Sequence, residues 1–281
     1  MDMTISGKVV AALVIQLVFS IAMPITVLVV WKIKHGLKLR SFLMGFVAFL
    51  VFALLGQQAL HMLVLDMNPA LGGFIASRPW LNALYVGLTA GLFEETARLL
   101  MFKTALRDDP EREHAVAYAI GHGGFECIVA LGLMAISNLL VTFALNSGNL
   151  TETIASMPAE EKQALMATVE MINGADLVAA LLTMLERVCM LVLHIALSVL
   201  LFTALHKKKM WLFPVAILAH AGVEMVSALH EAGFASLWLT EVVLVLYVLV
   251  ISIPALRMYR RLPSVKVEQV DQFGRPVQKK I

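Results

Sequence analysis

Seven apolar runs, each about 20 residues or longer, set the strongest limit on how this chain can fold. A helix needs about 20 mainly apolar residues to cross the hydrocarbon core of a bilayer. Hydrophobic residues make up 60% of the chain and charged residues 15%, whereas soluble domains are about 45–50% apolar. We therefore predict an all-α polytopic membrane bundle of about seven transmembrane helices. The predicted spans are residues 9–31, 41–65, 81–104, 114–145, 175–206, 210–229 and 236–256.

Lysine and arginine residues are concentrated in alternate connections between these runs. The connections after the first, third and fifth runs hold four, three and three of them, the tail from Arg257 holds seven, and the opposite connections hold three. Because cytoplasmic loops are rich in Lys and Arg, we expect the N-terminus outside and the C-terminus in the cytoplasm. We expect residues 1–262 to form one domain in the plasma membrane of a prokaryotic cell, and residues 263–281 to form a polar cytoplasmic tail.

The third run contains three charged residues that a bilayer tolerates poorly, Glu94, Glu95 and Arg98. A charge at the bilayer centre costs at least about 2.5–3.5 kcal/mol, so such residues usually face the bundle interior and mark functional sites. The spacing lets Arg98 reach both carboxylates on one helical face. One carboxylate would then stay ionised against Arg98 while the other is available as a base. A structural ion pair that locks helix packing is the alternative.

Histidines occupy the next three runs. His122 and Glu126 are four residues apart in the fourth run, and His220 and Glu224 repeat this spacing in the sixth, while His194 lies in the fifth. Each could be a packing residue by itself. However, at 1.5 Å per residue, Glu95 and the three histidines all fall about 12–20 Å from the cytoplasmic face. This shared depth favours a wet pocket into which the side chains converge.

These residue types suit hydrolysis of a peptide bond, which needs an activated water, a proton donor and a group that stabilises the oxyanion. Glu94 or Glu95 could activate the water together with His122, and His220 could stabilise the oxyanion. If a metal takes part, we expect His122, His194 and His220 with Glu95 to bind Zn²⁺ and to leave one position for water.

Three segments resemble the motifs of the CAAX-protease and bacteriocin-processing superfamily of intramembrane proteases. They are the glutamate pair and arginine at 94–98, the aromatic-xxx-His pattern at 118–122, and the His-xxx-Glu pattern at 220–224. Within this superfamily the chain is most similar to the YhfC-like membrane peptidases, across most of the seven runs. The resemblance implies a helical bundle with a conical pocket in the membrane, and a membrane-associated or lipidated peptide as substrate.

The resemblance also implies roles for individual residues. Glu94 or Glu95 with His122 would activate water, and His220 with Glu224 would stabilise the oxyanion. Glu224 stands where the superfamily pattern has asparagine. Because an ionised carboxylate repels an oxyanion, Glu224 must be protonated, paired or a metal ligand, which favours a zinc site.

Two other classes of protein are compatible with the same residues. A proton- or cation-coupled carrier would use Glu and His as relay groups, although we find no repeated half. A non-catalytic membrane protein for bacteriocin immunity or partner binding is the other. The sequence contains no phosphate-binding loop and no basic stripe with aromatic residues, so we expect neither nucleotide nor nucleic acid as a ligand.

Overall fold

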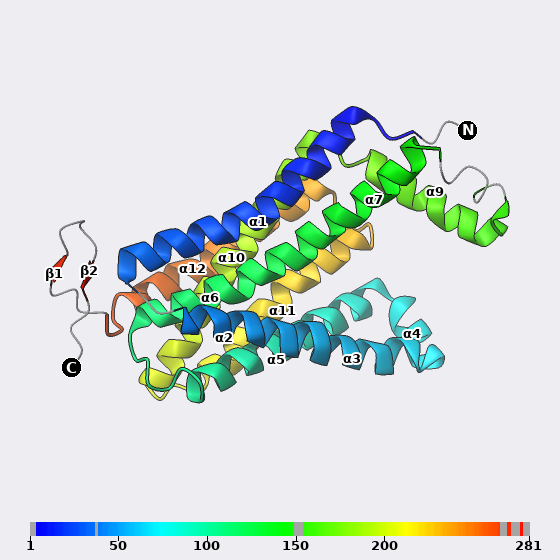
Figure 1. Cartoon of the computed structure of the whole chain (residues 1–281). Helices are drawn as coiled ribbons and strands as arrows, with labels where there is room; N and C mark the ends of the chain where they lie inside the picture. Colours follow the sequence, from blue (N-terminus) through cyan, green and yellow to red (C-terminus); the bar gives the residue numbers. More distant parts are fainter. Residues whose placement is uncertain are drawn as a thin grey trace. The chain divides into compact units, whose positions relative to one another are not determined.

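Helices account for nearly all of the elements in this computed structural model, which describes residues 4–36, 39–148, 154, 156–264, 269–270 and 276–277 (Figure 1). The α-helices are α1 (Gly7–His35), α2 (Arg40–Ala48), α3 (Gln58–His61), α4 (Pro69–Ala76), α5 (Pro79–Lys103), α6 (Arg112–Cys127), α7 (Met134–Asn146), α9 (Ala159–Asn173), α10 (Leu177–His206), α11 (Leu212–Glu231) and α12 (Leu237–Tyr259). Three π-helical segments, η1 (Phe49–Gln57), η2 (Met62–Asp66) and η3 (Ile128–Leu133), continue neighbouring α-helices. Two short strands, β1 (Gln269–Val270) and β2 (Pro276–Val277), pair antiparallel, with Gln269 opposite Val277.

Six helical segments in the described part of the chain are long and apolar enough to cross a membrane. They are Gly7–His35, Arg40–Asp66, Arg112–Asn146, Leu177–His206, Leu212–Glu231 and Leu237–Tyr259. The all-α polytopic bundle predicted from the sequence is confirmed, and the protein is a multi-pass membrane protein. The remaining predicted span corresponds to α5, which has 25 residues but falls outside this group because its polar residues lower its hydropathy. A seventh crossing and the orientation of the chain stay predictions.

The chain divides into two units, which are described separately. The first consists of Met1–Met23 and Cys127–Arg187, and the second of Pro24–Glu126 and Val188–Ile281. In the first unit, Val9 and Leu13 of α1 belong to one hydrophobic core with Ile172 of α9. The Asn146 side chain closes α7 onto the backbone of Ile5, accepting from its N–H at 2.8 Å and donating to its carbonyl at 2.9 Å.

The second unit is organised around the part of α10 that follows Val188. Leu193, Leu197 and Leu201 are fully buried in its hydrophobic core. A helix that is apolar all round is suited to the centre of a bundle, because no face needs water. Helices α5, α6 and α11 supply further residues of this core, including Ala97, Tyr118 and Val223. The unit therefore positions the faces of α5, α6 and α11 around α10.

Glycines allow two helix pairs of this unit to approach closely. A Cβ atom on Gly91 of α5 would lie 2.5 Å from the carbonyl oxygen of Ile217 in α11, and one on Gly121 of α6 would overlap the carbonyl oxygen of Phe42 in α2. Small residues at such contacts are typical of helix association in membranes. The contact at Gly91 brings the polar faces of α5 and α11 together, and the contact at Gly121 holds α6 against α2.

Candidate functional site

Four helices of the second unit bring seven polar side chains into one buried cluster. Each of the seven is at most 8% exposed. The members are Glu94, Glu95 and Arg98 from α5, His122 and Glu126 from α6, His194 from α10, and His220 from α11. Because burying ionisable groups is costly unless they are paired, the hydrogen bonds within this cluster determine its chemistry.

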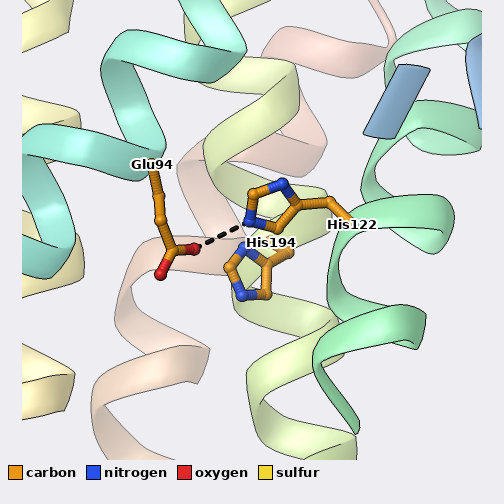
Figure 2. Close-up of side chains that lie close together, drawn as sticks. All are labelled: Glu94, His122 and His194. Atoms are coloured by element: carbon orange, nitrogen blue, oxygen red, sulfur yellow. Dashed lines mark hydrogen bonds and ion pairs between the residues drawn. The ribbon is translucent and has the colours of Figure 1, made fainter. Parts of the chain in front are cut away.

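The first part of the cluster is formed by Glu94, His122 and His194, whose side chains converge from three helices (Figure 2). The Nε2 atom of His122 lies 2.7 Å from Oε2 of Glu94. One ligand atom from each of the three residues lies within 4.8 Å of the other two. Two imidazoles and a carboxylate at such separations form a donor set that zinc accepts.

Glu95 has different partners from Glu94, although the two residues are adjacent. Arg98 binds Oε1 of Glu95, and both side chains are fully buried. The same oxygen lies 2.8 Å from Nδ1 of His220. The charge of Glu95 is therefore neutralised by Arg98, whereas Glu94 faces histidines.

His194 is held on both sides of its ring. Its Nδ1 atom lies 2.7 Å from Nη2 of Arg98, and its Nε2 atom lies 2.5 Å from Oε2 of Glu126. A guanidinium group can only donate hydrogen bonds, so Nδ1 is the acceptor and Nε2 carries the proton that is donated to Glu126. This pattern assigns the neutral form to His194.

The three histidines thus share one arrangement, in which a carboxylate binds one nitrogen of each ring. The pairs are His122 with Glu94, His194 with Glu126, and His220 with Glu95. The other nitrogens of His122 and His220 are buried and have no hydrogen-bond partner in the described part of the chain. The Nε2 atom of His220 lies 3.7 Å from Oε2 of Glu94. Carboxylates that hold ligating histidines in this way are typical of metal sites.

Aromatic rings line the cluster on the side of His122. The Phe49 ring of η1 meets His122 edge to face, with centroids 5.4 Å apart, and the Tyr118 ring stacks on it at 5.8 Å. Sequence reasoning included Tyr118 in a motif but missed Phe49, for which an apolar run gives no distinguishing signal. Phe49 is the first residue of a π-helical segment, and such segments are frequent at functional sites.

The structure places the other predicted residues as follows. Glu224 lies one helical turn beyond His220 and is only partly buried. The compact three-residue group contains Glu94 where the predicted zinc set had Glu95, because Arg98 and His220 already bind Glu95. The three histidines of the predicted zinc set lie together. The ring centroids of His122 and His194 are 4.8 Å apart, and those of His194 and His220 are 5.3 Å apart.

A bundle of apolar helices that encloses a buried cluster of glutamate and histidine residues defines a multi-pass membrane protein with an interior polar site. The family model described as YhfC intramembrane metalloprotease matches residues 19–244, which include every residue of the cluster, and the chain belongs to this family. The predicted resemblance to the YhfC-like membrane peptidases is thereby confirmed. The chain is also 29% identical over 229 residues to the "Uncharacterized membrane protein YhfC" of Bacillus subtilis (strain 168), covering 82% of this chain and 88% of that protein. No solved structure matches the chain significantly.

Proposed function

We propose that this protein is an intramembrane zinc peptidase that hydrolyses peptide bonds of membrane-associated or lipidated peptides. The observation that carries the proposal is the contact between Glu94 and His122, with Oε2 and Nε2 2.7 Å apart inside a buried cluster of three histidines. The name of the family, an intramembrane metalloprotease, supports the same activity.

The donor set fits a zinc ion. His122, His194 and His220 would hold it, since each ring is oriented by a carboxylate. His122 and His220 each have a buried nitrogen without a partner among the described residues, and Nδ1 of His194 would bind the ion in place of its hydrogen bond from Arg98. Such an ion would supply Lewis-acid polarisation of the scissile carbonyl and of the attacking water. Catalytic zinc sites have three protein ligands and an open position, so Glu94 is placed beside the ion as a base and not as a fourth ligand.

The residues of the chain then have separate roles. Glu94 accepts the proton of the attacking water, because it is the carboxylate of the pair that Arg98 does not neutralise. His122 fixes the orientation of Glu94 through the hydrogen bond at Nε2. Glu95 and Glu126 are positioning residues, since they hold the rings of His220 and His194 through Nδ1 and Nε2, respectively. Arg98 compensates the buried charge of Glu95.

The test identifies the protein N-termini that cleavage generates in cell membranes. It compares cells that produce the wild-type protein, the Glu94→Gln variant or the His61→Ala variant. His61 is a matched control because its ring contacts Gln57 and Tyr85 and none of the cluster residues. We expect a set of N-termini that is present with the wild type and His61→Ala and absent with Glu94→Gln. Identical N-termini in all three membranes would refute the peptidase assignment.

A further inference from the structure

A groove of about 610 Å³ lies in the second unit among α6, α10, α12 and the part of α1 that follows Pro24. Its floor includes Ile120, Ala196 and Ala255, which are at most 4% exposed. Its rim includes Leu249 and Ile253, which are 51% and 53% exposed. The two alanines of the floor, with large residues beside them, make the surface concave. The volume lies in the range of ligand sites, about 300–1,000 Å³.

The groove is separate from the Glu/His cluster. Ile120 and Ile195 line the groove, whereas His122 and His194, which are close to them in sequence, belong to the cluster. Residues one or two positions apart on a helix point in different directions. Helices α6 and α10 therefore present one face to each site. Among the groove residues, the side chains with polar atoms are those of Trp31, Ser252 and Tyr259, so its ligand must be apolar along most of its length.

One end of the groove has the features of a membrane interface. Trp31 and Tyr259 line the groove near the C-terminal ends of α1 and α12, and aromatic residues of these types are enriched at such interfaces. Trp31 donates from Nε1 to the carbonyl oxygen of Glu113 at 3.2 Å. The guanidinium carbon of Arg112 lies 4.4 Å from the centre of the Tyr259 ring. The Leu249–Tyr259 wall extends about 15 Å from this end toward the middle of the bilayer.

Further cations flank the same end. Lys32 and Lys34 follow Trp31 in the last turn of α1, and Arg257 and Arg260 flank Tyr259. All four are exposed, and none makes an ion pair with another described residue. A ligand with an apolar tail and an anionic head would satisfy both parts of the groove, since each Lys or Arg near the surface favours anionic lipid.

We infer that this groove binds one acyl chain of an anionic phospholipid, with the phosphate at the Lys32 and Arg257 end. A second copy of this chain is disfavoured as the occupant because it would bring the same cations together. The acyl chain of a lipidated substrate is disfavoured because the groove opens on the faces of α6 and α10 that point away from the Glu/His cluster. The site serves a structural lipid and is independent of the proposed peptidase activity.

Tryptophan fluorescence in vesicles tests the site directly, because Trp31 lines the groove. The other three tryptophans, Trp80, Trp211 and Trp238, are 60–62% exposed and can be replaced by Phe to leave Trp31 alone. The protein is reconstituted in phosphatidylcholine vesicles that contain small fractions of brominated phosphatidylglycerol or brominated phosphatidylcholine. We expect half-maximal quenching at about a fivefold lower fraction of the anionic lipid.

Three variants separate the groove from ordinary lipid contact. A protein with Trp238 alone reports an exposed position outside the groove and should be quenched equally by both lipids. Ala196→Phe fills the floor and should protect Trp31 from both. Lys32→Gln with Lys34→Gln changes exposed residues only, so folding is retained, and the preference for the anionic lipid should fall.

Several results would overturn the inference. Equal quenching of Trp31 by the two lipids would indicate ordinary contact with the bilayer, as would unchanged quenching in a folded Ala196→Phe protein. A dimer that is lost in Ala196→Phe would assign the groove to a second copy of the chain. Protection of Trp31 by a farnesylated peptide but not by unbrominated phosphatidylglycerol would assign it to a lipidated substrate.

Discussion

The Nδ1 atom of His220 lies 2.8 Å from Oε1 of Glu95, the carboxylate oxygen that Arg98 also binds. This contact distinguishes two adjacent glutamates that the sequence presents as equivalent. Glu95 neutralises Arg98 and orients an imidazole, whereas Glu94 meets His122 and lies 3.7 Å from the other nitrogen of His220. In the proposed mechanism, Glu95 is therefore the positioning carboxylate and Glu94 is the base.

The metal content should separate the histidines from Glu94. We expect the His122→Ala protein to lose stoichiometric zinc, because it removes one of three imidazole donors. The Glu94→Gln protein should retain zinc while its peptidase activity falls by about 10²–10⁴-fold, the usual contribution of a general base. Elemental analysis of gently purified protein provides the check, with His61→Ala as the control. Zinc lost from Glu94→Gln would make Glu94 a ligand and not the base.

Removal of Glu95 should destabilise the fold as well as the site. Glu95→Ala leaves the fully buried Arg98 without its carboxylate, which costs about 3–5 kcal/mol in the free energy of unfolding. Adding Arg98→Met should recover most of this stability, because no uncompensated buried charge remains. Activity should not return, because no carboxylate orients His220. Unfolding of the purified variants in detergent measures both effects. If the two substitutions destabilise additively, the pair is not coupled.

Glycine substitutions should have opposite effects at two positions. Gly121→Ala places a Cβ atom against the backbone of Phe42, so we expect α2 and α6 to separate and the free energy of unfolding to fall by about 1–3 kcal/mol. Gly73 of α4 has open space around it, and Gly73→Ala should stabilise the helix by about 0.5–1 kcal/mol. Thermal unfolding compares the two proteins. Equal stabilities would show that α2 and α6 are not held by close backbone contact.

The number of membrane crossings depends on α5 and can be read from two cysteines. With seven spans, Ser6→Cys lies outside and Lys207→Cys lies in the cytoplasm, so a membrane-impermeant maleimide should label only Ser6→Cys in intact cells. If α5 does not cross, four spans separate these positions and both lie on the same side. The native Cys127 and Cys189 are buried and should give little background.

The amino-acid sequence was sufficient to predict the class of the protein and to identify all seven residues of the buried cluster, although it also included Glu224, which lies outside the cluster. In a bilayer, the backbone N–H and C=O groups of an apolar run of about 20 residues find hydrogen-bond partners when the run is helical. The charged residues inside such runs had to face one another and not lipid. The depth of Glu95 and the three histidines, counted along separate helices, indicated that they meet. All of these properties are local in the chain, so periodicity and length were sufficient to predict them.

Which of these residues are hydrogen-bond partners depends on how the helices pack and could not be predicted. The sequence places His122 and Glu126 four apart on one helix, yet His122 binds Glu94 and Glu126 binds His194, which are 28 and 68 residues away. The reason is physical: residues at this spacing share a helical face, but their side chains project toward the neighbouring helix. For Glu126 that neighbour is α10, which lies close because α6 has a glycine there: a Cβ atom on Gly123 would lie 2.9 Å from the His194 ring. The groove beside Trp31 likewise exists only because four helices, distant in sequence, pack around small residues.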